Sequence, residues 1–470
     1  MASVSAPPRA PLVPPHTDAF TERWGKILII AFAMLAILPR ALEVDPKTAD
    51  FSAGSVNGQI QLGGILLLGF VLFFKRFERT FYDLRQVNVA LLLLVIWAFA
   101  SALWSPSPVT TIKRTIQAGG VIFMGLSMCL VQHPLQNFLK YVTNTLSLLL
   151  ILSLILIVVA PDIAREDNTS GHWRGVFEQK NGLGAVAAFC FIFWQARYYI
   201  EGIPLRRMLA GLGLSTFCLL LAHSSTSISV SLLASGVFHL FRARHLSSSF
   251  WKLRVFLLLT TVISVVLVLF FSVESRLPNW SEVVGPLASI FGKGTDLSQR
   301  TVIWQLVGEE VKRHPIMGLG YGAFWMGPGS PSQYIIDELY WIPYQSHNGY
   351  LDTINELGYI GLAILIAALL LHLSHIVRLF AINQVVAAFH LAIFIVLAIS
   401  NYTESNLFRG MLINSSLFIY SSVCVTNMLF RGHGLIKMHA GRGINVLAAA
   451  ATLPLPRSAQ SRQGVLGRRS

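Results

Sequence analysis

The sequence predicts an all-α membrane protein that crosses the bilayer many times. Of its 470 residues, 54% are hydrophobic and only 12% are charged, a composition too apolar for an ordinary soluble domain. Apolar runs near the roughly 20 residues that a helix needs to cross a bilayer recur along most of the chain. Only one stretch between such runs, residues 273–348, is long and mostly polar. We therefore expect about twelve transmembrane helices, with a large loop between the ninth and the tenth.

The chain divides into a tail, a membrane domain and a second tail. Residues 1–26 are rich in proline and lack the pattern of a signal peptide, so we expect a disordered cytoplasmic tail. Residues 27–430 form the membrane domain, and residues 431–470 form a basic tail. The expected membrane helices cover residues 27–43, 61–75, 87–104, 116–132, 143–160, 182–200, 207–222, 228–241, 252–272, 349–371, 384–401 and 411–430.

Lysines and arginines decide the expected orientation. With the N-terminus inside, most of the 36 lysines and arginines fall in the inner segments and the tails, as the positive-inside rule requires. Both termini are then cytoplasmic, and the segments 161–181 and 273–348 face the outside. We attribute the net charge of +14 to contact with anionic lipids rather than with nucleic acid, because the basic residues cluster beside apolar segments.

The residues that commonly bind metals are sparse. The cysteines are isolated, within or beside apolar segments, and indicate neither a disulfide framework nor a thiolate metal site: Cys129, Cys190, Cys218 and Cys424. Glu43 and Asp45 have the spacing of a metal-binding acidic pair, but two carboxylates alone favour a solvated loop. We expect no metal and no other cofactor.

A shorter outer loop carries two cations and two aromatic residues just before a membrane helix. It reads Gly171-His-Trp-Arg174-Gly-Val-Phe-Glu-Gln-Lys180-Asn-Gly182. Arg174 and Lys180 could meet a lipid-linked diphosphate at the depth of the headgroups. The alternative is that tryptophan and arginine only anchor the loop at the membrane interface.

Within the long outer segment, residues 298–311 place apolar side chains at helical spacing. Ser298 is available as an N-cap and Pro315 as a stop, so we expect an amphipathic helix on the outer face of the membrane. Arg300 lies in its first turn, and a guanidinium offers a planar fork of donors that matches two anionic oxygens. The alternative is a solvated surface arginine.

His347 directly precedes the expected tenth helix. The N-terminus of a helix disfavours the charged imidazolium, so a histidine there tends to stay neutral and able to accept a proton. Asp352 and Glu356 are four residues apart and share one face of this helix, with Asn348 near them. Acidic groups at that depth usually face a polar cavity. The alternative for His347 is a helix cap or an interface residue.

Glycine-containing motifs lie on both sides of the segment 347–356. Gly358 and Gly361 would allow another helix to approach closely, which is a packing role. The sequence Gly318-Leu-Gly320-Tyr-Gly322 lies in an outer loop, without the strand-to-helix context of a nucleotide-binding motif. We expect no nucleotide site there.

Four motifs, taken in their order along the chain, resemble those of a known family. They are Arg174-Gly-x-Phe-x-x-x-Asn181, Ser298-x-Arg-x-x-x-Trp304, His314-Pro-x-x-Gly-x-Gly320, and His347-Asn348 followed by Gly358-x-x-Gly361. Together with the helix count and the large outer loop, they resemble the O-antigen ligase and polymerase superfamily of bacterial inner-membrane glycosyltransferases. The resemblance covers most of residues 27–430 and implies a GT-C-like fold. We expect His347 to be catalytic; the expected substrate-binding residues are Arg174, Lys180, Arg300, Asn348 and Glu356.

The resemblance implies transfer of a glycan from an undecaprenyl diphosphate carrier to an acceptor sugar on the periplasmic side. Ligases of the superfamily transfer to lipid A core, and polymerases extend a polysaccharide. The variant Glu178-Gln-Lys-Asn-Gly182 resembles the exopolysaccharide production branch. We therefore expect a metal-independent, inverting polymerase of lipid-linked repeat units, with a flippase and a chain-length co-polymerase as partners.

Two other classes of function stay open at this point. A transporter or flippase would use Glu356 and Glu404 near the membrane to carry protons. Such proteins usually have paired halves with interrupted helices, whereas here one outer loop is much longer than the others. The other class is a non-enzymatic assembly subunit.

Overall fold

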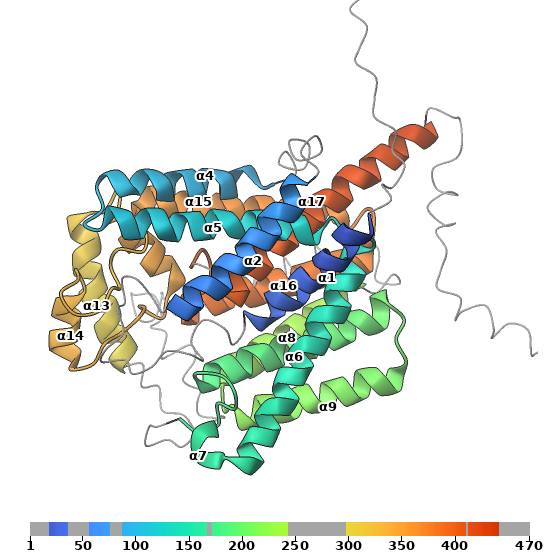
Figure 1. Cartoon of the computed structure of the whole chain (residues 1–470), viewed down its shortest axis with the longest axis horizontal. Coiled ribbons are helices and arrows are strands. Elements are labelled where there is room, and N and C mark those ends of the chain that lie inside the picture. The colour runs from blue at the N-terminus through green and yellow to red at the C-terminus, as the bar shows by residue number, and fades with distance from the viewer. Residues whose placement is uncertain are drawn as a thin grey trace, which may run out of the picture.

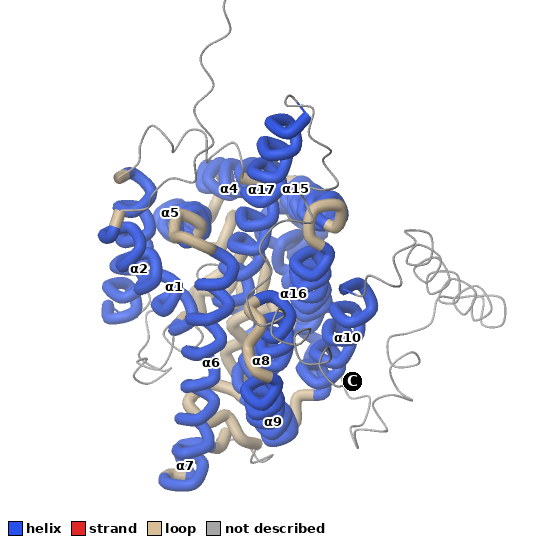
Figure 2. Tube along the Cα trace, turned by 90° about the vertical axis from the view of Figure 1, so that its right-hand side faces the viewer, coloured by secondary structure: helices blue, strands red, loops and turns tan. Residues whose placement is uncertain are grey.

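The computed structural model describes residues 18–35, 56–75, 87–166, 172–242, 298–409 and 412–440. Within these residues the fold is helical, and Figure 2 shows helices joined by loops with no strand among them. The long helices before the expected outer loop are α1 (Ala19–Met34), α2 (Val56–Phe74), α4 (Val89–Ala100), α5 (Pro108–Met128), α6 (Pro134–Val159), α8 (Lys180–Ile200), α9 (Leu205–Leu221) and α10 (Ser225–Arg242). The others are α13 (Ser298–Arg313), α15 (Gly349–Leu379), α16 (Gln384–Thr403) and α17 (Ile413–Ala440), with the short helices η1 (Ser101–Leu103), α7 (Pro161–Ala164) and α14 (Gln333–Leu339).

The prediction of a multi-pass, all-α membrane protein is confirmed in this part of the chain. Five stretches are long and apolar enough to cross a membrane: Pro134–Val159, Lys180–Ile200, Gly349–Leu379, Gln384–Thr403 and Ile413–Phe430. Two shorter apolar helices cover Ile60–Phe74 and Val89–Leu103. The expected span at 252–272 lies outside the described residues, as does the first third of the expected outer loop. The count of twelve spans stays a prediction.

Both ends of the expected membrane domain differ from the helices observed. α1 begins at Ala19, inside the stretch that we expected to be a disordered tail, because Asp18 caps it. The Asp18 carboxylate accepts the Thr21 N–H at 2.7 Å, and this backbone hydrogen bond lowers the Asp18 pKa to about 2. At the other end, α17 continues to Ala440, while its apolar span ends at Phe430, as expected.

The helices form an elongated bundle (Figure 1). α4 and α5 lie beside α15 and α2, while α6, α8 and α9 make up the opposite side of the bundle. α10 packs against α16, as Figure 2 shows from the side. α13 and α14 gather at one end, on the left in Figure 1, where α15 begins. This is the end at which the motifs of the sequence analysis meet.

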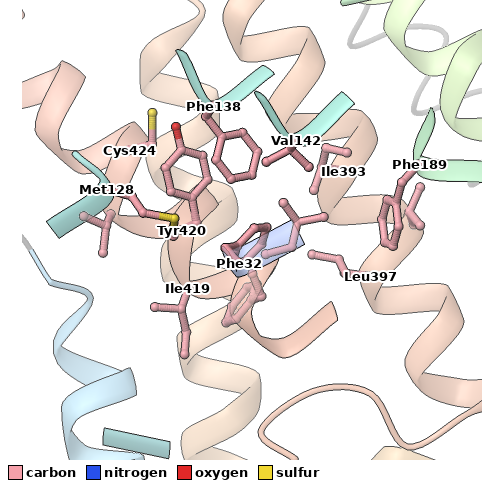
Figure 3. Close-up of a cluster of buried hydrophobic side chains, with 14 of the residues drawn as sticks. Phe32, Met128, Phe138, Val142, Phe189, Ile393, Leu397, Ile419, Tyr420 and Cys424 are labelled. Atoms are coloured by element: carbon pink, nitrogen blue, oxygen red, sulfur yellow. The ribbon is translucent and has the colours of Figure 1, made fainter. Parts of the chain in front are cut away.

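An aromatic cluster joins the helices in the middle of the bundle (Figure 3). The rings of Phe138 on α6 and Tyr420 on α17 are stacked with their centroids 3.7 Å apart, and Phe32 on α1 lies 5.4 Å from Phe138. Lipid tails are as apolar as these side chains, so tight packing rather than exclusion from water holds such helices together. The cluster therefore fixes the scaffold that carries the site.

A second, smaller core lies under α13. The expected amphipathic helix is present as α13, and it packs against α15. Its apolar face contacts residues of the following loop and of α14, and the buried members are Ile303, Val307, Val311, Phe324, Trp325 and Ile335. Burial of these side chains fixes α13 to the bundle, so its apolar face covers protein. Its place at the outer membrane face stays a prediction.

Candidate functional site

The site is built on a break in α15. At Gly358 the backbone leaves the helical conformation, with φ 69° and ψ −174°. The segment 315–320 takes up the hydrogen bonds that the break releases: Leu319 N–H donates to Asn355 C=O at 2.9 Å, and Tyr359 N–H donates to Pro315 C=O at 2.8 Å. We expected the glycine to admit another helix, and this was wrong, because the neighbour is a loop. The short first part of α15, residues 349–357, is thereby held at the end of the bundle.

A buried ion cluster fixes this first part of α15. Asp352 and Glu356 share a face, as predicted, and Arg409 lies between them, at 2.7 Å from Asp352 Oδ2 and 3.2 Å from Glu356 Oε1. Burial acts to lower the pKa of Arg409, but the two carboxylates outweigh it and raise the pKa. Gly322 N–H donates to Glu356 Oε2 at 2.9 Å. Glu356, which we expected to bind substrate, is thus enclosed by protein groups.

Asp352 also positions the loop that carries the catalytic candidate. Its Oδ1 accepts the Trp325 indole N–H at 2.8 Å, and its Oδ2 accepts the Ser346 N–H at 3.2 Å. The Ser346 carbonyl in turn accepts the Trp304 indole N–H at 2.8 Å. The residue before His347 is therefore held from both the α13 and the α15 side.

His347 lies between that anchored residue and a helix cap. Asn348 is the N-cap of α15, and its side chain accepts the N–H groups of Tyr350 and Leu351. His347 has a positive φ of 56°, a conformation that few residues adopt without support from their surroundings. Its side chain is 21% exposed, and its Nδ1 lies 2.8 Å from Glu404 Oε2.

Glu404 is the point where four separate segments meet. Its Oε1 accepts from Asn181 Nδ2 at 3.0 Å and from Arg300 Nη2 at 3.2 Å, while its Oε2 accepts from Gln345 Nε2 at 2.8 Å and faces His347. Arg300 Nη1 also donates to the Thr403 carbonyl at 3.0 Å. The carboxylate therefore joins the start of α8, the start of α13, the loop before α15 and the end of α16.

From the sequence, we considered Glu404 only as a proton carrier of a transporter. The sequence signal for this role is weak: an acidic residue at the end of a membrane helix, 57 positions after His347 in the sequence. No spacing rule links residues so far apart.

Arg174 and Lys180 lie in the loop that leads to Asn181. Arg174 donates to two carbonyls of its own loop region, those of Ile163 at 3.1 Å and Glu178 at 3.3 Å. Lys180 begins α8, and its backbone N–H donates to Glu166 at 2.6 Å. The structure thus brings Arg300 and His347 together on opposite oxygens of Glu404, and it holds Arg174 on a neighbouring loop that reaches Glu404 through Asn181.

The described residues contain no group of three side chains suited to hold a metal ion. Glu43 and Asp45 lie outside the described residues.

Comparison with known proteins agrees with the motifs. Residues 210–366 match the family model described as O-Antigen ligase. The resemblance to the O-antigen ligase and polymerase superfamily is confirmed. The matched range contains Arg300, His347 and Glu356, whereas Arg174 and Glu404 lie outside it.

The chain is also similar to a protein of exopolysaccharide production. Over 197 residues the chain is 27% identical to the exopolysaccharide production protein ExoQ of Rhizobium meliloti (strain 1021). The alignment covers 41% of this chain and 43% of that protein, so less than half of either chain is compared.

Proposed function

We propose that this membrane protein is a glycosyltransferase that polymerises undecaprenyl-diphosphate-linked repeat units into exopolysaccharide at the periplasmic face of the bacterial inner membrane. The observation that carries the proposal is the meeting of Arg300 and His347 on the Glu404 carboxylate. Similarity to an exopolysaccharide production protein favours a polymerase over a ligase that transfers to lipid A core. A flippase would supply the donor, and a co-polymerase would set the chain length.

The reaction needs a base for the acceptor and cations for the leaving group. The oxygen of the acceptor hydroxyl forms a bond to the anomeric carbon, while the bond from that carbon to the diphosphate breaks and the diphosphate keeps the electron pair. Because Nδ1 of His347 faces a carboxylate at 2.8 Å, we assign the ring proton to Nδ1. The lone pair of Nε2 then takes the proton of the hydroxyl. A single displacement inverts the anomeric centre.

Arg300 supplies positive charge where the diphosphate departs. Its guanidinium binds anionic oxygens through two parallel hydrogen bonds, and preorganised donors of this kind stabilise the developing charge. Arg174 and Lys180 lie on the adjacent loop and would bind the same diphosphate from the α8 side. These cations could neutralise the diphosphate without a metal ion. Asn348 and Glu356 would support the site, the first as the cap of α15 and the second through Arg409.

Variants of His347 and Arg300 test the assignment of roles. His347→Ala should lower glycan transfer by about 10²–10⁴-fold, the usual contribution of a general base, while binding of the lipid diphosphate persists. Arg300→Lys should weaken that binding, since lysine keeps the charge but loses the planar fork. Arg313→Lys, at a side chain that is 69% exposed, serves as the matched control. Normal transfer and normal donor binding in both site variants would contradict the proposal.

A further inference from the structure

We propose that Glu404 couples binding of the donor to activation of His347, by passing Arg300 from its own carboxylate to the donor diphosphate. The inference rests on the proposed function and adds a residue and a sequence of events to it. Both oxygens of Glu404 accept hydrogen bonds, and the two functional groups use different oxygens: Arg300 is on Oε1 and His347 is on Oε2. One carboxylate therefore serves the donor-binding group and the base together.

Toward His347, Glu404 acts as a positioning residue. A carboxylate at Nδ1 fixes both the orientation and the tautomer of the imidazole, and it stabilises the imidazolium that forms when Nε2 takes a proton. Gln345 donates to the same oxygen and keeps it in place. The proton of the acceptor moves only as far as Nε2 of His347.

Toward Arg300, Glu404 is a competitor of the donor. The side chains of Arg300 and Glu404 are 29% and 21% exposed, so solvent reaches the ion pair and weakens it. A diphosphate carries more negative charge than one carboxylate and matches the guanidinium fork, so it should displace Glu404 from Arg300. Asn181 remains on Oε1 to satisfy that oxygen after the exchange.

The exchange makes the base stronger only after the donor has bound. While Arg300 is paired with Glu404, its positive charge offsets the carboxylate that faces His347. When Arg300 turns to the diphosphate, the charge of Glu404 acts on His347 alone. Asp352, Glu356 and Arg409 pair with one another behind Ser346 and take no part in this exchange.

Glu404→Gln separates the two roles, because glutamine has the same shape and no charge. Without the competing carboxylate, the variant should bind undecaprenyl diphosphate up to about fivefold more tightly than the wild type, a limit set by the usual strength of a partly exposed ion pair. Its turnover should fall at least about tenfold, as is typical when an orienting carboxylate is lost. Binding and turnover are measured on the purified protein in lipid nanodiscs. Glu309→Gln, on the exposed side of α13, should change neither.

Two further variants show whether the tighter binding acts through Arg300. In the double variant Arg300→Ala with Glu404→Gln, affinity should equal that of Arg300→Ala alone, since the two changes act on one interaction. Glu404→Asp keeps the charge but withdraws it from His347, so turnover should fall while affinity stays within about twofold of the wild type. If the glutamine variant does not fold, Glu404→Ala replaces it, because it also removes the competing charge and should likewise bind the donor more tightly.

The outcomes distinguish this inference from the proposed function. If the wild type does not bind the lipid diphosphate, or Arg300→Ala binds it normally, the proposed function fails. If those results are as expected but Glu404→Gln binds the donor as the wild type does or more weakly, the exchange is overturned. Equal loss of binding and turnover would give Glu404 a purely structural role, which also overturns it.

Discussion

At the scale of single residues, Arg409 is the shared counterion of two buried carboxylates. It is 16% exposed and lies between two carboxylates, Asp352 and Glu356, that are 2% and 3% exposed. Removing one partner of such a cluster leaves an uncompensated buried charge, which is far more costly than losing a surface ion pair.

Arg409→Leu should therefore destabilise the protein by about 3–5 kcal/mol, because both carboxylates would lose their counterion. Lys312→Ala removes an ion pair that is exposed on both sides and should cost less than about 1 kcal/mol. Thermal unfolding in detergent compares the two variants. Similar small shifts in both would show that the cluster contributes little to stability.

In each interacting group at the site, one partner was predictable from the sequence and the other was not. The spacing of Asp352 and Glu356 and the position of His347 before a helix are local features, and the structure confirms both. Their partners, Arg409 and Glu404, follow after a complete helical hairpin. Such contacts depend on how α15 and α16 pack, which local periodicity does not determine.

At the scale of elements, the break in α15 determines where the site lies. A Cβ at Gly358 would lie 2.0 Å from the Ile316 carbonyl oxygen, and the positive φ of this residue is costly for any residue with a side chain. Gly358 does allow a close approach, as expected, but of a loop and not of another helix. The sequence of the 315–320 loop does not show that this loop packs against α15.

Gly358→Ala should destabilise the protein by at least about 2 kcal/mol, from backbone strain and overlap with the 315–320 segment. Gly308→Ala is the matched control, since a Cβ there meets nothing within 4 Å and the residue lies within α13. The control should be neutral or gain about 0.5–1 kcal/mol from helix propensity. Apparent melting temperatures of the two purified variants test this, and equal values would contradict the account of the break.

The positions of most described helices were predictable from the apolar runs, because the length and the apolarity of a run are local properties of the sequence. The ends were less accurate, since caps such as Asp18 act through single hydrogen bonds. The surface covered by α13 was not predictable from its sequence either. An amphipathic face can cover a membrane or a protein, and here it covers Phe324 and Trp325.

At the scale of the whole molecule, the orientation in the membrane decides on which side the chemistry takes place. The distribution of lysine and arginine predicts that α14 is periplasmic and that the turn between α15 and α16 is cytoplasmic. All four native cysteines are buried, so introduced thiols should dominate any labelling.

In intact spheroplasts, a membrane-impermeant maleimide should label Glu338→Cys and leave Ala381→Cys unlabelled until the membrane is opened. Both positions are exposed, and they lie on opposite sides of the α15 span. The reverse pattern would place the site in the cytoplasm and exclude periplasmic transfer.

The central claim is that this chain itself transfers glycan by means of His347 and Arg300. The most direct test supplies the purified protein in nanodiscs with a defined undecaprenyl-diphosphate-linked oligosaccharide, in the presence of a chelator, and follows the release of undecaprenyl diphosphate and the growth of the glycan. We expect longer glycan from the wild type and nearly none from His347→Ala, at equal protein recovery. If the wild type gives no product, or the product forms equally in the His347 variant, the account is contradicted.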